Sequence, residues 1–328
     1  MKKTVSRGGC FILGALVLGL TLFTSCSTSN MAMKAVSDML TGSGSTDAFT
    51  ADNDPELVGD ALPFAIKLYE VLLSKNPDHD GLLLTTGSLF VMYANAFVQG
   101  PASMLSPGEY SERDAQYKRA KNLYIRGVDI LSRGLENKYP GFADAYDSGS
   151  LDTVLSKMGA GDVPLLYWTV AGTLSAYSLD PFDLKFGLKV PQLAAMIARA
   201  YELDPDFNDG AIDDFYILFY ASLPASLGGN PGLVDRHFEL ALERSRGLSA
   251  GPYVSYATSV CIPAQNYPLF KEYLNKALEI DPDANPSGRL VNIISQRKAR
   301  YLLDSAPEYF IDLGEDEALY YGDFYEYD

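Results

Sequence analysis

Few residues in this chain have the types and spacing that catalysis requires. The two histidines are His79, which follows an Asn-Pro pair, and His237, which lies in Asp235-Arg236-His237-Phe238. Neither has a cysteine or histidine companion at metal-ligand spacing. The sequence contains no Gly-x-Ser-x-Gly elbow, phosphate-binding loop or dinucleotide fingerprint. We therefore expect no catalytic residues, no metal, no cofactor and no enzyme activity, and we interpret His237 as a packing or helix-surface residue.

Acylation of Cys26 is the one covalent reaction that the sequence indicates. A positive start formed by Lys2, Lys3 and Arg7 precedes an almost wholly apolar run from Cys10 to Leu20, and a small residue stands before Cys26. A transmembrane helix is the alternative, but the apolar stretch over residues 8–23 is shorter than the ~20 residues that a bilayer span needs. The pattern predicts a lipoprotein signal peptide over residues 1–25 and a periplasmic, lipid-anchored chain that starts at Cys26, with the membrane leaflet left open.

The folded part of the chain must be stabilised by a core. Cys10 is lost with the signal and Cys26 is consumed by lipid, so Cys261 is left alone and no intramolecular disulfide can form. Its setting, Val260-Cys261-Ile262-Pro263, predicts a buried and unreactive thiol. With 328 residues, of which 47% are apolar, the chain is long enough to bury a large core.

Acidic residues dominate the charge. The formal net charge is −16, and loss of the three basic residues of the signal leaves 23 basic against 42 acidic residues, or −19. This balance argues against a nucleic-acid partner, which needs clustered Lys and Arg. Residues 306–328 form an acidic, tyrosine-rich tail, which is either solvated or a partner-binding segment.

Aromatic and amide side chains on mainly apolar stretches are the candidates for a ligand site. They fill gaps between helices in most proteins, but together they could line an apolar cavity with polar groups in its wall. The candidate ligand-binding residues are Tyr93, Asn95, Trp168, Tyr177, Tyr216, Tyr220, Tyr253 and Tyr256.

Helices must position these side chains. Residues 26–54 are rich in Ser, Thr, Asn, Gly and Asp and predict a flexible tether. From Pro55 onward, apolar residues recur at spacings of three and four, which predicts an all-α domain over residues 55–305. The expected helices are Glu56–Lys75, Gly81–Gln99, Tyr110–Asn137, Val163–Ser178, Pro191–Leu203, Asp209–Ala221, Pro231–Arg246, Tyr267–Ile280 and Pro286–Leu303.

Several of these helices end in a similar way. Apolar side chains on one face are followed by Leu203-Asp204-Pro205-Asp206 in one helix and by Ile280-Asp281-Pro282-Asp283 in another. The proline prevents continuation, so the chain turns back. This pattern predicts tetratricopeptide-like helical hairpins, about four degenerate repeats with extra helices, which must stack to bury their faces.

An ordered series of short motifs resembles a known family, the periplasmic T-component lipoproteins of tripartite ATP-independent periplasmic (TRAP) transporters. The series covers most of the mature chain and consists of Tyr93-Ala94-Asn95-Ala96-Phe97-Val98, Ala120-Lys121-Asn122-Leu123-Tyr124-Ile125-Arg126-Gly127, Val163-Pro164-Leu165-Leu166-Tyr167-Trp168, Ala200-Tyr201-Glu202-Leu203-Asp204-Pro205, Ala221-Ser222-Leu223-Pro224 with Gly228-Gly229, and Arg297-Lys298-Ala299-Arg300-Tyr301-Leu302-Leu303.

The resemblance implies an all-α fold of cryptic tetratricopeptide hairpins and a homotrimer with a ligand-accessible pore in each protomer. It also implies docking of a periplasmic solute-binding protein, the P-component, and relay of a small hydrophobic or organic-acid ligand. The net negative charge counts against an acid. The chain departs from the family in its longer acidic end and in Gly251–Asn266, where Pro252 and Pro263 interrupt a helix.

Three other functions are alternatives. A structural lipoprotein scaffold for envelope assembly would use the helical array to hold protein segments and would have no small-molecule site. A glycan-binding lipoprotein of the nutrient-uptake kind is usually a much longer chain than this one, and this difference in length counts against that alternative. An enzyme would show turnover that depends on a named carboxylate.

Overall fold

The described part of the chain is entirely helical. The computed structural model describes residues 34–42, 44 and 47–313, and these contain no strand. A helix over residues 34–41 comes first. The α-helices that follow are α2 (Asp47–Thr50), α3 (Pro55–Lys75), α4 (Asp80–Tyr93), α5 (Gly100–Ala102), α6 (Tyr110–Lys138), α7 (Phe142–Ser148), α8 (Asp152–Leu155), α9 (Val163–Ser178), α10 (Leu184–Gly187), α11 (Val190–Leu203), α12 (Phe207–Ser222), α13 (Val234–Arg244), α14 (Gly251–Tyr256), α15 (Tyr267–Glu279), α16 (Arg289–Asp304) and α17 (Ala306–Tyr309). The all-α prediction is confirmed.

Each helix expected from the sequence corresponds to an observed one, but three expected α-helical stretches change type along their length. The expected helix Gly81–Gln99 is α-helical only to Tyr93 and then continues as the π-helix η1 (Ala94–Gln99). The expected helices Pro231–Arg246 and Pro286–Leu303 begin with a 3-10 turn before α13 and α16. A second π-helix, η6 (Ala257–Cys261), follows α14. Because π-helical turns often occur at functional sites, the ends of α4 and α14 are candidate positions for a functional site.

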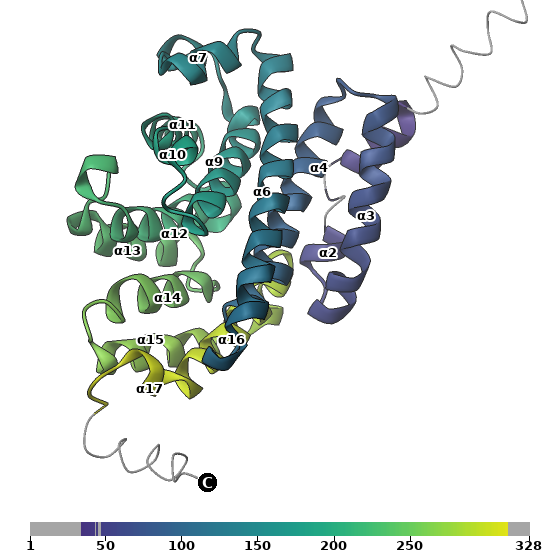
Figure 1. Ribbon diagram of the computed structural model, residues 1–328. Helices are drawn as coiled ribbons and strands as arrows, with labels where there is room; N and C mark the ends of the chain where they lie inside the picture. Colours follow the sequence, from purple (N-terminus) through teal and green to yellow (C-terminus); the bar gives the residue numbers. More distant parts are fainter. Residues whose placement is uncertain (1–33, 43, 45–46, 314–328) are drawn as a thin grey trace, which may run out of the picture.

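The long helix α6 forms the centre of the molecule, with α3 and α4 on one side and α9 on the other (Figure 1). Helices α4 and α6 approach closely where Gly87 faces Gly127. A Cβ atom at Gly127 would lie 2.8 Å from the carbonyl oxygen of Gly87, which is too close for any side chain. Two glycines therefore set the spacing between these two helices.

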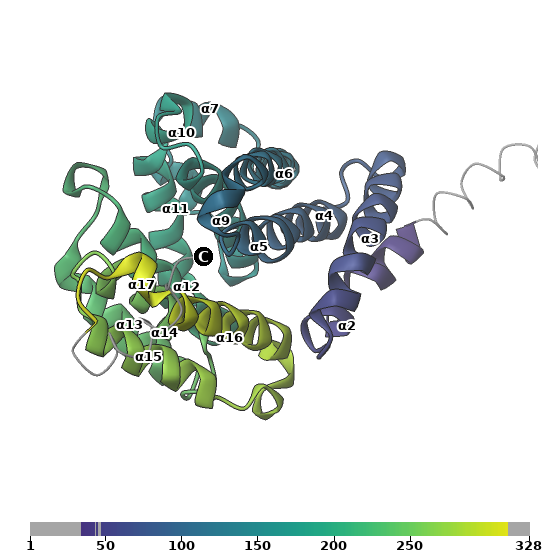
Figure 2. The same ribbon diagram turned by 60° about the horizontal axis from the view of Figure 1, so that its bottom comes forward.

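The last long helix returns to the first. Leu290 of α16 is buried in a cluster formed by apolar residues of α3 and α4. Arg289 of α16 donates a hydrogen bond to the carbonyl oxygen of Ala51, 2.8 Å away, and Arg297 pairs with Glu56 at the start of α3. Figure 2 shows the result: the helices follow one another round a ring that α16 closes against α2 and α3. The ring places α9, α12, α14 and α16 around its inside.

Parts of the predicted tether and tail are folded onto this ring. In the predicted tether, the helix over residues 34–41 contacts α3, since the Tyr69 hydroxyl donates a hydrogen bond to the Leu40 carbonyl oxygen at 2.8 Å. Phe310, in the predicted tail, is buried against Tyr267 and Phe270. The signal peptide, Cys26 and residues 314–328 lie outside the described residues.

One helical stretch of the described residues, Asp80–Ala102, is long and apolar enough to cross a membrane. Of its most apolar window, 61% is buried inside the protein. Packing against α3, α6 and α9 accounts for this hydropathy, because a helix that is apolar all round is the expected core helix of a large bundle.

Candidate functional site

The aromatic side chains selected from the sequence form several clusters instead of one pocket. Tyr216 and Tyr220 of α12 stack with their ring centroids 5.0 Å apart. His237 of α13 lies 4.7 Å from the Tyr216 ring and 5.4 Å from the Tyr220 ring. Tyr216 is buried, and Tyr220 lies between the two largest apolar clusters of the protein. This group is therefore part of the packing between α12 and α13.

A second cluster lies beside α14. Tyr253 and Tyr256 both contact Phe238 and Tyr273, with ring centroids between 4.8 and 5.8 Å apart. The Tyr256 hydroxyl donates a hydrogen bond to the Asp235 carboxylate at 2.6 Å. Both tyrosines thus join α13, α14 and α15, and Tyr256 also immediately precedes η6.

The remaining candidates lie on α9 and at the end of α4. Trp168 contacts Tyr167 edge to face at 5.3 Å, and Tyr177 packs against Gly187. Tyr93 stacks on Phe97 at 5.9 Å. Asn95, in η1, is exposed. In the same π-helix, Gln99 accepts a hydrogen bond from the hydroxyl of the fully buried Tyr124 at 2.5 Å.

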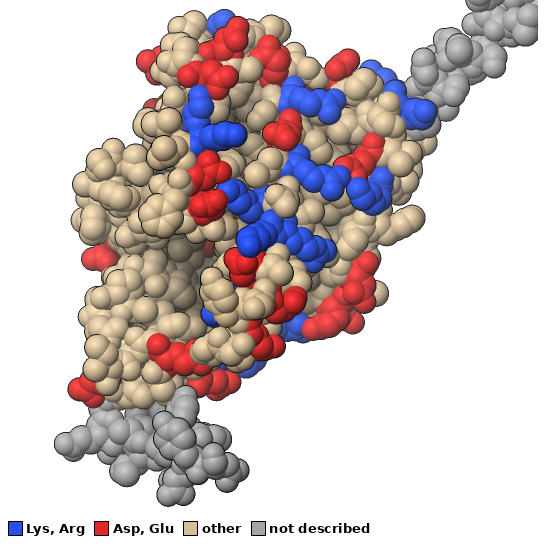
Figure 3. Space-filling model, viewed as in Figure 1, with Lys and Arg blue, Asp and Glu red and all other residues tan. Residues whose placement is uncertain are grey.

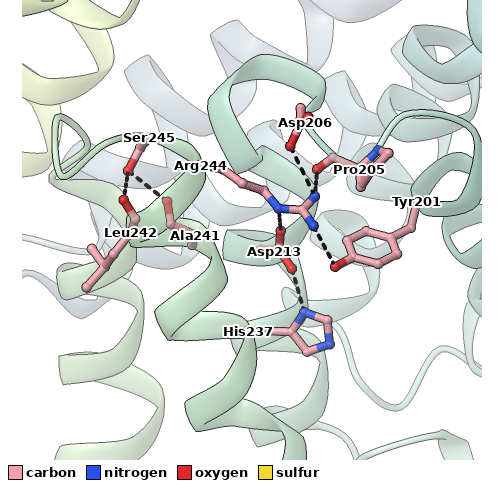
Figure 4. A network of polar contacts seen from close by, with 9 residues as sticks. All are labelled: Tyr201, Pro205, Asp206, Asp213, His237, Ala241, Leu242, Arg244 and Ser245. Atoms are coloured by element: carbon pink, nitrogen blue, oxygen red, sulfur yellow. Dashed lines mark hydrogen bonds and ion pairs between the residues drawn. The ribbon is translucent and has the colours of Figure 1, made fainter.

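A polar network fixes the corner between α11, α12 and α13 (Figure 4). His237 Nδ1 donates to Oδ1 of the fully buried Asp213 at 2.6 Å, and Arg244 Nε lies 3.2 Å from Asp213 Oδ2. The same guanidinium donates to the Pro205 carbonyl oxygen and, at 3.2 Å, to the Tyr201 hydroxyl. The network therefore ties the end of α11 to α12 and α13.

His237 has a structural role in this corner. Its hydrogen-bond partner, Asp213, is already engaged by an arginine. Of the two hydroxyls in Figure 4, that of Tyr201 accepts from Arg244 at 3.2 Å, and that of Ser245 donates to the carbonyl oxygens of Ala241 and Leu242. Neither is bonded to the imidazole. The arrangement lacks the nucleophile-to-base contact that a histidine-assisted reaction needs.

Asp214, the next residue along α12, has a different environment. Its Oδ1 atom is buried without a hydrogen-bond partner. A Cβ atom at Gly251 of α14 would lie 2.9 Å from Asp214 Oδ2, so a side chain there would displace the carboxyl group. Burial raises the pKa of Asp214 to about 6, against the opposing effects of Ser255 and of the Lys298 charge. Asp214 was not among the residues predicted from the sequence.

Lys298 of α16 faces the same region. Burial lowers the pKa of its ammonium group, and the charge of Asp214 opposes that shift. Within the described part of the chain, Lys298 forms no hydrogen bond and no ion pair with any residue. Lys298 is half-buried, so its ammonium group is only partly desolvated.

Asp214, Lys298 and Tyr167 lie on three helices of the ring, α12, α16 and α9. Burial is the largest cause of the pKa shift of each group. Each residue is half-buried. These three ionisable side chains therefore lie in a less solvated part of the protein than the other charged residues of the surface.

The outer surface is hollowed on one face of the ring. Figure 3 shows a hollow beside α6, at the level where α12 and α14 lie in Figure 1, and the atoms around it belong mainly to uncharged residues. Lys and Arg side chains gather on the other side of it, over α6 and α3. A hollow lined mainly by uncharged residues is suited to binding an apolar group.

The described residues contain no group of three or more His, Cys, Asp or Glu side chains placed to hold a metal ion. Cys261 is fully buried in the α14 to α15 region, and burial raises the pKa of its thiol to about 12. A thiol with such a pKa is protonated at neutral pH and is a poor nucleophile.

Comparison with known proteins identifies the family. Residues 51–310 match the family of the TRAP transporter T-component. The chain is also 35% identical over 327 residues to an uncharacterized protein of Treponema pallidum (strain Nichols), a match that covers 95% of this chain and all of the relative. The matched range contains every α-helix from α3 to α17. The chain therefore belongs to the TRAP transporter T-component family.

Proposed function

We propose that this protein is a membrane-anchored periplasmic accessory protein of a TRAP-type solute uptake system. It binds the solute-binding P-component and passes a small ligand through its interior. Membership of the T-component family supports an accessory role in TRAP transport and a membrane-associated location. The observation that carries the proposal is the match of residues 51–310 to the T-component family, and the uncharged hollow beside α6 supports an opening for a ligand.

In this proposal the lipid on Cys26 holds the protein at the membrane, and the ring of helices forms a rigid platform. Two or three acyl chains give firm anchoring, at about 0.8 kcal/mol per buried methylene. The partner docks so that its ligand cleft faces the uncharged hollow. In this proposal the Asp-Pro turns between α11 and α12 and between α15 and α16 are the turns of tetratricopeptide-like repeats.

An exposed apolar stripe on α3 supports self-association. Leu57, Ala61, Phe64, Leu68 and Val71 follow one another at alternating spacings of four and three. They are exposed, with Phe64 keeping 75% of its surface, while Val58, Leu62 and Ile66 of the same helix are buried. A stripe with this heptad spacing is the seam that helices use to pack on one another. We assign it to the contact between protomers of the expected homotrimer.

Sedimentation and partner capture test the proposal together. The form beginning at Ser27 contains every described element, and we expect it to sediment as a trimer and to bind the solute-binding protein encoded beside it. Envelope-assembly factors captured in place of a solute-binding protein would support the alternative, a structural lipoprotein scaffold. A variant with Phe64→Asp and Leu68→Asp should sediment as a monomer, whereas Lys75→Ala, on the same helix, should not change the oligomer.

A further inference from the structure

Residues 179–189, the α10 loop, join α9 to α11 and expose apolar side chains to solvent. Phe182, Leu184 and Leu188 keep 92%, 74% and 72% of their surface accessible. All three lie on or beside the short helix α10. Single exposed apolar side chains are ordinary on a protein surface, but several gathered in one short segment mark an interaction site.

The α10 loop is held in place by its polar residues. The Lys121 ammonium of α6 lies 2.8 Å from the Asp180 carboxylate and 2.9 Å from that of Asp183. At the other end of the loop, Lys189 pairs with Asp147 of α7 at 2.7 Å. These polar side chains contact the protein while the apolar ones face solvent, the reverse of the usual arrangement. A loop fixed in this way loses little freedom on binding a partner, which favours affinity.

We propose that the α10 loop is the docking contact for the solute-binding P-component, which covers the three apolar side chains with an apolar patch beside its ligand cleft. This inference rests on the proposed function, because it locates the contact with the partner named there. Aromatic and aliphatic anchors at the centre of an interface supply most of its binding energy. The exposed Lys185, which pairs with no carboxylate in the described part of the chain, lies at the rim opposite an acidic side chain of the partner.

The position of the loop favours this partner over a second copy of the chain. Figures 1 and 2 both place α10 and α3 on opposite sides of α6. A contact between protomers through the α3 stripe therefore leaves the α10 loop open. The loop lies on the same side of α6 as the uncharged hollow (Figures 1 and 3). A partner seated with its cleft over the hollow is thus on the side that presents this loop.

The charges around the loop count against a membrane as its occupant. Binding to anionic lipid needs clustered cations that are free of carboxylates. Lys121 and Lys189 are both engaged by aspartates. Asp180 and Asp147 also keep 47% and 77% of their side chains accessible, so both would repel anionic headgroups. Of the lysines on or against the loop, only Lys185 is left to attract them.

Titration of the full chain, in detergent micelles, with the solute-binding protein encoded beside it tests the contact. Phe182→Ala should weaken binding at least tenfold, and Phe182→Ala combined with Leu188→Ala at least a hundredfold. Val291→Ala, at an exposed apolar position of α16 outside the loop, is the matched control and should bind as the unaltered chain does. Unchanged binding in the double variant would overturn this inference and leave the proposed function standing.

The ion pairs of Lys121 provide a second test, of the fixed loop itself. Lys121→Met removes both pairs and no apolar contact, so it should weaken partner binding, by less than Phe182→Ala does. Lys118→Met, which removes an exposed pair with Asp114 on the same helix, is the matched control and should have no effect. Equal binding by both variants would overturn the claim that α6 holds the loop in position for the partner.

Hydrogen exchange on the unaltered chain tests the contact without any substitution. Amides of residues 179–189 should exchange at least tenfold more slowly in the complex than in the free chain, whereas those of α3 should be unchanged. Added protection elsewhere with none in the α10 loop would overturn the inference.

The double variant also distinguishes the other occupants. If it binds the partner normally but sediments as a monomer, the loop is a contact between protomers. If it binds the partner normally but, in the Cys26→Ser form, loses affinity for phosphatidylglycerol vesicles, the loop is a membrane contact. Either result would overturn the assignment to the P-component. An unaltered chain that binds no solute-binding protein would overturn the proposed function, and this inference with it.

Discussion

Two neighbouring aspartates of α12 should respond in opposite ways to loss of their charge. Asp214→Asn removes a carboxylate that burial destabilises, with a pKa raised from 3.8 to about 6. Because the native state holds the proton more tightly than the unfolded state, the native protein loses stability as the pH rises through this interval. At 1.36 kcal/mol per pKa unit, the loss is about 3 kcal/mol at pH 7. Asparagine has nearly the same shape as aspartate but does not ionise, so the Asp214→Asn variant does not lose this stability.

Urea unfolding at several pH values measures the effect. We expect the free energy of unfolding of Asp214→Asn to exceed that of the unaltered chain by about 3 kcal/mol at pH 7 and by less than about 1 kcal/mol at pH 4, since the carboxyl group is then largely protonated in the native state and partly in the unfolded state. The pKa of about 6 already includes the attraction between the Asp214 carboxylate and the Lys298 charge, so that attraction does not change these free energies further.

Asp213→Asn is the matched control. The Asp213 carboxylate is fully buried and contacts His237 at 2.6 Å and Arg244 at 3.2 Å. Removing one partner of a buried ion pair costs roughly 3–5 kcal/mol, so this variant should be less stable at neutral pH. If Asp214→Asn were no more stable than the unaltered chain at pH 7, or if its advantage did not shrink in acid, the Asp214 carboxylate would be well solvated and burial would not raise its pKa.

Further variants test the fold, the oligomer and the anchor. Gly127→Ala should cost about 1–3 kcal/mol in thermal or urea unfolding, because its Cβ would meet the Gly87 carbonyl; no loss would mean that α4 and α6 can separate freely. Leu290→Ala should cost about 2–4 kcal/mol and loosen the ring closure, which hydrogen exchange in α2 and α3 would detect; unchanged protection there would contradict the closure. Phe64→Asp should shift sedimentation toward the monomer without loss of helicity, and an intact oligomer would exclude the α3 stripe as the contact. Cys26→Ser should release the protein from the membrane fraction, and retention there would refute the lipid anchor.

The helices could be predicted from the sequence because their signals are local. Apolar spacing, proline and the Asp-Pro turns fixed the end of α11 at Leu203 and the end of α3 at Lys75. The π-helices η1 and η6 were not predicted, since they have the same apolar residues as the α-helices that they extend. Closure of the ring was also missed, because it depends on contacts such as that of Arg289 with Ala51, which are 238 residues apart.

The candidate site was predicted only in part. Aromatic residues were chosen because their types suit a cavity wall, and the structure groups Tyr216 with Tyr220 and Tyr253 with Tyr256. Asp213 and Asp214 look alike in the sequence, but successive residues of a helix point about 100° apart. One therefore meets Arg244, and the other meets α14.

Lys298 was missed for the same reason. In the sequence it belongs to the basic run Arg297-Lys298-Ala299-Arg300, which suggests a solvated face. In α16, Arg297 and Arg300 are exposed, whereas Lys298 is half-buried. Successive helix residues point about 100° apart, so the buried positions Asn292, Gln296 and Ala299 gave no signal for position 298.

The proposed accessory role is best tested by sedimentation of the form beginning at Ser27, alone and mixed with the solute-binding protein encoded beside it. We predict a trimer that takes up the solute-binding protein and sediments with it as one larger species. A monomer that is indifferent to that protein would contradict the proposed role.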